Sequence, residues 1–494
     1  MPADPRPGDA PRPLLDKIVR GLGRLAVRTF YRRIEVTGLE NVPRSGPVIV
    51  VANHANSLID GVIIGSLLPR TPRFLTASTV WDFKAVVPVL RAAGVVPVYR
   101  RQDGRHEGGQ LEETFETAAD LLAEGGVLAI FPEGLSHNDS RLLPIKTGVA
   151  RIALETLKAH PELDLKIVPV CLHYAEKSRF RSSVFMQVGT PIGARDELPG
   201  FLSTETVTRS KAVRGLKARV RNALLQVSLQ SSTWEDVRLV SCAAEIWRSV
   251  QMPDTPTTDL PSTIAAHRRV LSGARWLRIH RPAEWTAIRR QVLDYADGLK
   301  AQGLEDRHVA AFDSGKAPAP FASVPIWVVP ALPVALLGLV LNVAPGVVLW
   351  LMRRRKDPDK MATWSVFAGL MILPLYWVLV ALVVGSAASV AWGFGLGVAA
   401  ALVALVAVPA TGLVAAKTWD VVRRTRDNLH AARTLAANPE PAHRLAKARA
   451  ALVGQLHRLS KIYERGEGPV PTANANERRA HPDPGPAPAK AARA

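Results

Sequence analysis

Short apolar runs alternate with segments of helical periodicity through most of the N-terminal half of the chain. The run Val48–Ala52 is rich in Val, follows the turn signal Ser45–Pro47 and ends in polar residues, which predicts a buried strand. The same pattern predicts strands at 33–38, 71–77, 94–100, 127–131 and 166–172, and helices at 60–68, 81–93, 111–124 and 148–160. Continuously apolar strands that alternate with helices predict an α/β fold, with a central, mostly parallel sheet flanked by helices.

The segment 14–31 has the periodicity of an amphipathic helix. Its apolar positions are Leu14, Leu15, Ile18, Val19, Leu22, Leu25 and Ala26, and its basic positions are Lys17, Arg20, Arg24 and Arg28. Two interpretations remain open. The helix lies in a membrane interface with its cations against lipid phosphate, or it packs on the domain with a solvated basic face. Both interpretations keep this helix near the membrane-facing side.

Two long stretches, 317–352 and 361–416, contain no Asp, Glu, Lys or Arg. An uncharged apolar stretch longer than about 18 residues is a candidate to enter a membrane. The second stretch is long enough for two spans, whereas four prolines interrupt residues 324–352 (Pro325, Pro330, Pro333 and Pro345). A helical extension followed by a C-terminal membrane-embedded helical region is therefore expected after the α/β domain.

Basic clusters at 353–356 and 417–426 predict the orientation of this region, because Lys and Arg gather on the cytoplasmic side of membrane segments. A full crossing at 324–352 would put the first cluster outside. We therefore predict a re-entrant hairpin at 324–352, two spans within 361–416, and a cytoplasmic catalytic domain in a multi-pass protein of the cell membrane.

The chain divides into six predicted segments. They are a disordered lead (1–13), a catalytic domain that includes the amphipathic helix (14–225), a helical extension (226–316), the membrane region (317–416), a basic helical segment (417–465) and a disordered tail (466–494).

The charge balance predicts an anionic partner. The 63 Lys and Arg exceed the 43 Asp and Glu, which gives a formal net charge of +20. Nucleic acid and anionic lipid both fit such an excess. The uncharged stretches favour an anionic phospholipid membrane, and no nucleic-acid partner is expected. With only two cysteines and no metal-ligand spacing around them, neither a disulfide framework nor a metal site is predicted.

Candidate chemistry is concentrated where predicted strands end. His54 and Asp60 lie between a strand and a helix, an arrangement suited to an imidazole base oriented by a carboxylate. Arg100 and Glu133 also follow strands, and in a parallel sheet the carboxyl ends of strands share one edge. His137 and Asp139 form an alternative pair, but their polar loop favours surface positions.

Four segments in order resemble the motifs of the glycerolipid acyltransferase family typified by lysophosphatidate acyltransferase. They are Asn53-His54 with Asp60, Gly94 to Arg100, Phe131-Pro132-Glu133-Gly134 and Val168-Pro169-Val170. The resemblance covers about residues 14–225 and is closest to the glycerol-phosphate and dihydroxyacetone-phosphate acyltransferase branch. Two features depart from the usual pattern. Five residues rather than four separate His54 from Asp60, and Leu135-Ser136 replaces a customary Thr-Arg.

The resemblance implies acyl transfer from a thioester of coenzyme A or acyl carrier protein to a glycerol phosphate hydroxyl, without a cofactor. It implies catalytic roles for His54 and Asp60, and substrate-binding roles for Asn53, Arg100, Glu133, Gly134 and Lys146, with Arg101 or Arg141 as alternatives to Lys146. Glycerol-3-phosphate and 1-acylglycerol-3-phosphate remain alternative acceptors. An inactive lipid-binding or scaffold protein is a second hypothesis. Transport is disfavoured by the lack of charged residues in the apolar stretches.

Overall fold

A computed structural model describes residues 13–77, 81–82, 87, 94–98, 110–137, 139, 141–174, 180–228, 233–252, 259–315, 324–353 and 361–462. The chain forms two compact units. The first comprises Met1–Val237, Thr258–Pro261 and Ala319–Ala432, and the second comprises Arg238–Thr257, Ser262–Pro318 and Arg433–Ala494.

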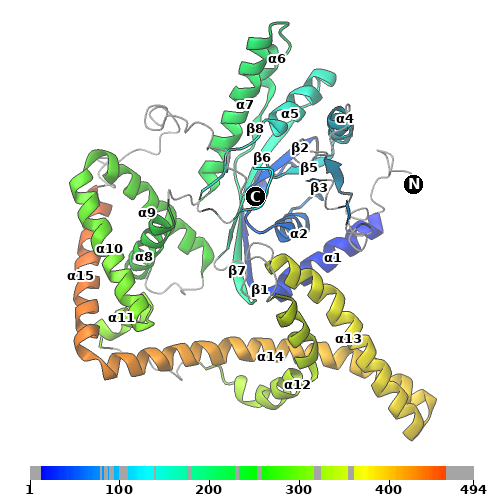
Figure 1. Ribbon diagram of the computed structural model, residues 1–494, viewed down its shortest axis with the longest axis vertical. Coiled ribbons are helices and arrows are strands. Elements are labelled where there is room, and N and C mark those ends of the chain that lie inside the picture. The colour runs from blue at the N-terminus through cyan, green and yellow to red at the C-terminus, as the bar shows by residue number, and fades with distance from the viewer. Residues whose placement is uncertain are drawn as a thin grey trace, which may run out of the picture. The chain divides into compact units, whose positions relative to one another are not determined.

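The first unit contains a central sheet of eight strands (Figure 1). They are β1 (Tyr31–Thr37), β2 (Val48–Ala52), β3 (Arg73–Ala77), β4 (Val96–Val98), β5 (Val127–Ile130), β6 (Lys166–Tyr174), β7 (Ser182–Val188) and β8 (Ile192–Gly193). Their order is β1-β7-β6-β2-β5-β3-β4, with β8 paired to β6. All neighbours are parallel except β6 with β7 and β6 with β8, which confirms the predicted mostly parallel sheet.

Strand β2 is the centre of the core, and all five of its residues are buried. Ile49 and Val51 pack on one face of the sheet, under α4 (Gln110–Ala123), α5 (Gly148–Ala159), α6 (Leu198–Phe201) and α7 (Thr206–Val227). Val48, Val50 and Ala52 pack on the other face, against α1 (Pro13–Phe30) and α2 (Leu58–Leu67). Because helices cover both faces, the strand is apolar at every position rather than at alternate ones. Each fully buried Val or Ile side chain stabilises the fold by about 1.5–3 kcal/mol.

Helix α1 is amphipathic, with Lys17 and Arg28 exposed, while two of its arginines also contact the end of α2. Arg20 donates to Thr71 Oγ1 at 3.1 Å and to the Leu68 carbonyl, and Arg24 Nε donates to the Ser66 carbonyl at 2.8 Å. These carbonyls belong to the last turn of α2, where cations bind favourably to unpaired acceptors. Three apolar side chains of α1 are also exposed: Ile18, Leu22 and Leu25.

Among the described residues, three long apolar helices follow: α12 (Val328–Arg353), α13 (Met361–Trp392) and α14 (Phe394–Ala437). Each is long and apolar enough to cross a membrane. The predicted hairpin at 324–352 is wrong, because α12 is one continuous helix that contains Pro333 and Pro345. Neighbouring helices allow such prolines by giving the freed backbone groups other partners. The turn between α13 and α14 is at Gly393, whose φ of 92° is accessible to glycine.

Polar contacts join these helices within their apolar parts. Asn342 of α12 accepts from Trp377 Nε1 of α13 at 3.0 Å and donates to the Val408 carbonyl of α14 at 3.3 Å. Tyr376 donates to the Leu341 carbonyl at 2.6 Å. A Cβ atom on Gly338 would clash with the Thr411 carbonyl, so α12 and α14 approach closely at this glycine.

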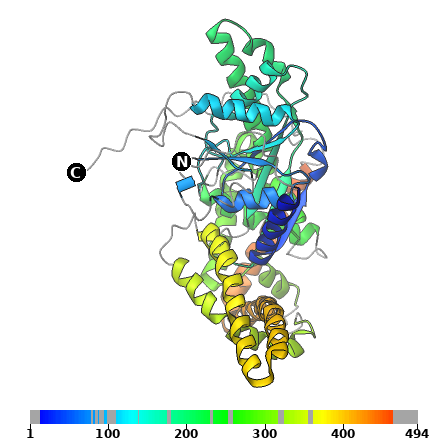
Figure 2. The ribbon, with the colours of Figure 1, turned by 90° about the vertical axis from the view of Figure 1, so that its right-hand side faces the viewer.

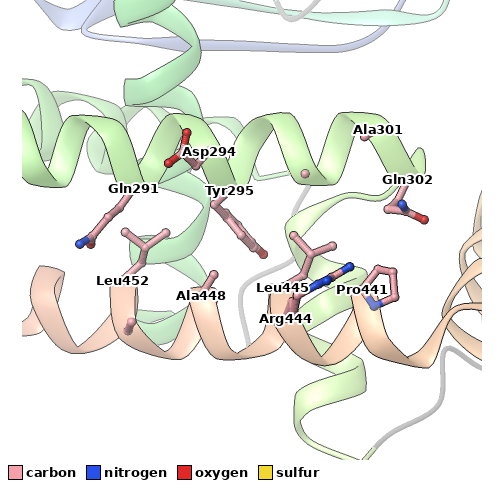
Figure 3. A pocket seen from close by; sticks show the side chains of 12 residues that line it. Gln291, Asp294, Tyr295, Ala301, Gln302, Pro441, Arg444, Leu445, Ala448 and Leu452 are labelled. Carbon is pink, nitrogen blue, oxygen red and sulfur yellow. The ribbon is translucent and has the colours of Figure 1, made fainter.

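The second unit is helical and contains α8 (Trp234–Gln251), α9 (Leu260–His280), α10 (Pro282–Gln302), α11 (Asp306–Asp313) and α15 (Pro439–Ile462). A cavity of about 480 Å³ lies between α10 and α15, with Tyr295 on one side and Leu445 and Leu452 on the other (Figure 3). Asp294 and Arg444 also line it, but it contains none of the residues predicted to act on substrate.

Candidate active site

The imidazole of His54 and the carboxylate of Asp60 form a direct pair at the carboxyl end of β2. His54 follows the strand in the loop to α2, and Asp60 lies in the first turn of that helix. Nδ1 of the ring is 3.0 Å from Oδ2 of Asp60. Because a carboxylate accepts hydrogen bonds, Nδ1 carries the proton and the neutral ring has its lone pair on Nε2. The His54 side chain is 18% exposed and that of Asp60 is fully buried, so the ring can reach substrate while its partner cannot.

The loop between His54 and Asp60 has an unusual backbone conformation at Ser57. This residue has φ 52° and ψ −140°, a backbone conformation that residues other than glycine rarely adopt. Its backbone N–H donates to Ser136 Oγ at 2.9 Å, which ties the loop to the segment after β5. The loop therefore bulges locally, and the longer spacing does not separate the imidazole from the carboxylate.

Asp60 is held by donors from two other segments. The backbone N–H of Asn56 donates to Oδ2 at 2.7 Å, and the Tyr174 hydroxyl at the end of β6 donates to Oδ1. Burial, reinforced by the Asp60 charge, raises the pKa of Tyr174 well above its ordinary value, so its hydroxyl remains a donor. Asn56 Nδ2 in turn donates to the Tyr31 hydroxyl at 3.2 Å. Burial also raises the pKa of Tyr31.

Glu133 contacts the backbone on both sides of the site. Its Oε1 accepts from the backbone N–H of His54 at 2.9 Å, and its Oε2 accepts from that of Leu143 at 2.8 Å and from His137 Nε2. The Glu133 side chain is fully buried. The sequence predicted that this residue shapes an acceptor site. In the structure it positions the His54 loop, a task that the motif alone did not indicate.

The two residues of the alternative pair, His137 and Asp139, differ in solvent exposure. Asp139 has the predicted surface position, at 56% side-chain exposure, whereas His137 is only 13% exposed and the prediction is wrong for it. The backbone N–H of His137 also donates to the His54 carbonyl at 3.2 Å. His137 therefore belongs to the network that fixes the His54 loop.

Asn53 bridges the His54 loop and β6. Its Oδ1 accepts from the Leu172 backbone N–H at 2.8 Å, and its Nδ2 donates to the Leu172 carbonyl at 3.1 Å. A side-chain amide that pairs twice with one residue acts like a short extension of the sheet. Asn53 thus fixes the start of the loop that carries the imidazole.

The remaining predicted residues lie around Glu133 or outside the described residues. Gly134 has φ 75°, and a Cβ added to it would be 2.8 Å from Nζ of Lys146. The exposed Lys146 chain therefore passes over Gly134, which brings an ammonium group next to the Glu133 segment. Arg100 and Arg101 follow β4 in sequence and lie outside the described residues.

Three neighbouring strands thus supply one site. β6, β2 and β5 are adjacent in the sheet, and Tyr174, His54 and Glu133 lie at or just beyond their carboxyl ends. The His54 ring also stacks on Phe131, with centroids 4.0 Å apart and an angle of 11° between the planes. This arrangement fixes the imidazole through its backbone, its Nδ1 and its ring face, and leaves Nε2 for chemistry.

Comparisons with known proteins identify the family of this chain. The Acyltransferase family model matches residues 33–173, which include His54 and Glu133. Human 1-acyl-sn-glycerol-3-phosphate acyltransferase alpha is 30% identical over 227 residues, covering 44% of this chain and 71% of the human protein. Glycerol-3-phosphate O-acyltransferase 2 of Saccharomyces cerevisiae is 27% identical over 292 residues, covering 54% of this chain and 37% of the yeast protein.

A solved structure is also similar: the 1-acyl-sn-glycerophosphate acyltransferase PlsC from Thermotoga maritima, at 24% identity and a TM-score of 0.31, covering 43% of this chain and 80% of that protein. The chain spans little more than a third of the yeast relative. With the family model and the human relative together, the chain belongs to the acyltransferase family.

Proposed function

We propose that this chain is a membrane-bound acyltransferase that moves a fatty acyl group from an acyl thioester to a hydroxyl of a glycerol phosphate acceptor. The observation that carries this proposal is the His54–Asp60 pair, with its buried carboxylate on Nδ1 and its exposed ring edge at Nε2. Acyl-CoA and acyl carrier protein both provide the thioester, and glycerol-3-phosphate or 1-acylglycerol-3-phosphate provides the hydroxyl. Each yeast and human relative named above carries one of these acceptors in its name.

In the proposed reaction, His54 acts as general base. Nε2 removes the proton from the acceptor hydroxyl while the hydroxyl oxygen attacks the thioester carbonyl carbon. The resulting tetrahedral intermediate breaks its carbon–sulfur bond, the ester is released, and the thiolate takes up the proton that His54 received. Asp60 stabilises the imidazolium that exists between these two proton transfers. The protein forms no covalent bond to the acyl group in this scheme.

The phosphate of the acceptor needs cationic partners near His54. Lys146 lies over Gly134, next to the segment that bonds the His54 backbone, and is one candidate. Arg100 is the second candidate, since a guanidinium group can bind phosphate through two parallel hydrogen bonds. Glu133 and Asn53 act as positioning residues in this proposal, because their described contacts are to protein backbone and, for Glu133, also to the His137 ring.

We further infer that the catalytic domain is cytoplasmic and that α13 and α14 are two antiparallel spans. Asp420 is one turn beyond the uncharged stretch that ends at residue 416, and it pairs with Arg181 of the sheet domain at 2.8 Å. The basic segment 417–426 is therefore on the same side as the catalytic site, which agrees with the positive-inside rule. Two spans return the chain to this side, so α12 enters the apolar layer without crossing it completely.

The proposal is tested with membranes that contain the full chain. Labelled acyl-CoA and acyl carrier protein are each offered with glycerol-3-phosphate and with 1-acylglycerol-3-phosphate. His54→Ala is expected to reduce kcat by about 10²- to 10⁴-fold, the usual contribution of a general base. His160→Ala is the matched control, since His160 is a partly exposed histidine whose described ion pair is with Glu162. An unchanged rate in His54→Ala contradicts the mechanism. No turnover with any substrate pair favours a lipid-binding scaffold instead.

A further inference from the structure

An arginine–aspartate pair and three further arginines lie near one another where α14 leaves its uncharged part. Nε and Nη2 of Arg181 donate to Oδ2 of Asp420 at 3.0 and 2.8 Å. Both side chains are nearly buried, at 12% and 8% exposure. Arg423 and Arg424 follow on the same helix about one turn later, and Arg32 completes the group from β1. These residues are far apart in sequence, so tertiary structure rather than a run of basic residues builds the cluster.

The sheet edge places Arg32 beside Arg181. The backbone N–H of Arg181 donates to the Phe30 carbonyl at 2.7 Å, and Tyr31 pairs with Ser182 where β1 meets β7. Partial burial lowers the pKa of Arg32, and the charges of Arg424, Arg181 and Arg423 lower it further, against the opposing effect of Asp420. The positive charges near Arg32 thus exceed the negative charge of Asp420, whose carboxylate is bonded to Arg181.

The cluster lies at the depth of lipid headgroups. At 1.5 Å per residue, Arg423 and Arg424 are about 10–12 Å along the helix axis from residue 416, where the uncharged stretch ends. A bilayer's polar layer extends roughly 5–8 Å beyond its hydrocarbon core, and an arginine side chain reaches back over the remaining distance. Trp419 is 60% exposed on the same part of α14, and exposed tryptophans are typical of the membrane–water boundary.

We propose that Arg32, Arg423 and Arg424 form a binding site for the phosphate of an anionic phospholipid headgroup, with the Arg181–Asp420 pair as its rigid base. Guanidinium groups from two elements surround a single anion better than one flexible basic segment does, because their planar donor forks bind phosphate oxygens in pairs. The site holds the sheet domain against an anionic membrane. It depends on the membrane location inferred above but not on acyl transfer.

The test uses the full chain purified in a non-ionic detergent. Calorimetry measures binding of a short-chain phosphatidylglycerol, a short-chain phosphatidylcholine and inorganic phosphate. The triple variant R32Q/R423Q/R424Q is expected to bind phosphatidylglycerol at least tenfold more weakly than the wild type, since each basic residue near an anionic surface contributes about fivefold. Phosphatidylcholine is expected to bind weakly to both proteins.

The control is R426Q, which removes one positive charge from the helix that carries Arg423 and Arg424. Arg426 is 72% exposed and pairs with Asp427 at 3.4 Å, so its loss is expected to change binding less than twofold. The variant R32K/R423K/R424K keeps the charge but replaces the planar guanidinium groups by ammonium groups. It is expected to lose part of the affinity for phosphatidylglycerol. Its unfolding temperature separates a binding defect from misfolding.

Three results would overturn the proposal. An equal loss in R426Q would assign the attraction to diffuse charge. Undiminished binding of phosphatidylglycerol by the triple variant would show that these three arginines do not form the site. Inorganic phosphate that binds as tightly as phosphatidylglycerol, with the same dependence on the three arginines, would assign the site to a soluble phosphate. Because binding is measured without turnover, an inactive protein with intact lipid binding would refute only the proposed reaction.

Discussion

At the scale of single residues, the site is a buried carboxylate that several donors hold in place. Asp60 is fully buried, and a buried charge is tolerated only when hydrogen bonds replace its water. The Asn56 backbone, the His54 ring and the Tyr174 hydroxyl are those replacements. Tyr174 has no proposed contact with substrate. Its effect on catalysis therefore passes through Asp60 to the imidazole.

Tyr174→Phe is expected to lower kcat about tenfold and to reduce the free energy of unfolding by about 1–3 kcal/mol, because it leaves Oδ1 of buried Asp60 without that donor. The loss also concentrates negative charge on Asp60, which stabilises the imidazolium of His54. The acid limb of the kcat/KM profile should consequently move to higher pH. Rate measurements across pH, with thermal unfolding in parallel, check both effects.

A chemically matched control exists in the second unit. The Tyr295 hydroxyl donates to Asp306 Oδ1 at 2.8 Å, and both residues are buried. Tyr295→Phe should therefore cost similar stability and leave the pH profile of acyl transfer unchanged. If the two variants shift the profile equally, or if neither shifts it, the positioning role of Tyr174 is refuted.

The sequence predicted part of this site for clear reasons. His54, Asp60 and Glu133 stand at ends of apolar runs, so the pattern alone brings their segments to one edge of the sheet. Tyr174 extends the predicted run 166–172 by two residues and carries no spacing signal. The longer spacing between His54 and Asp60 indicated that the loop must differ from the usual one. It did not indicate that Ser57 would have a positive φ. His137 faces inward because of Glu133, a contact that a polar loop sequence does not indicate.

At the scale of elements, the strands with continuous apolar runs follow from the apolar pattern, whereas β7, which lies between β1 and β6, does not. β7 was not predicted, because Ser182, Ser183 and Gln187 break its apolar run. Its main partner β1 is also distant in sequence, so only the folded sheet accounts for it. The continuous helix α12 was missed for a similar reason. Prolines predict breaks from local chemistry, whereas Tyr376 of α13 donates to the Leu341 carbonyl, which Pro345 leaves without its helical donor.

The proposed pair of spans makes a prediction at this scale. Single cysteines replace Phe394, next to the Gly393 turn, and Arg426, beyond the second span, in a chain whose natural Cys171 and Cys242 are changed to Ala. A membrane-impermeant maleimide should label position 394 in intact cells and position 426 only after permeabilisation. Phe394 is 81% exposed and Arg426 is 72% exposed, so neither thiol is shielded by the protein. Labelling of both from the same side would contradict two full spans.

At the scale of the whole molecule, the second unit is assembled from distant parts of the chain. Its helices α8 to α11 precede the apolar helices, and α15 follows them. Arg449 of α15 connects these parts. Its Nε and Nη2 donate to the Asp306 carboxylate at 3.0 and 3.3 Å, and Nη2 also donates to Ser249 Oγ at 2.7 Å. Composition predicted helices here, but a pairing across 143 residues of sequence leaves no local pattern.

Arg449→Met is expected to destabilise the second unit by about 3–5 kcal/mol, because it leaves the Asp306 charge buried without its cation. Methionine fills similar volume, so the cost reports the charge rather than a cavity. The double variant Arg449→Met/Asp306→Asn should regain part of this loss, since it removes the unpaired charge as well. Arg290→Met is the control: its pair with Asp294 is exposed and 3.9 Å long, and its loss should change stability by less than about 1 kcal/mol. Denaturant unfolding of the full chain in detergent measures all three. Equal effects of Arg449→Met and Arg290→Met would mean that the Arg449–Asp306 pair does not hold α15 to the helices that precede the apolar region, and that apolar packing alone joins them.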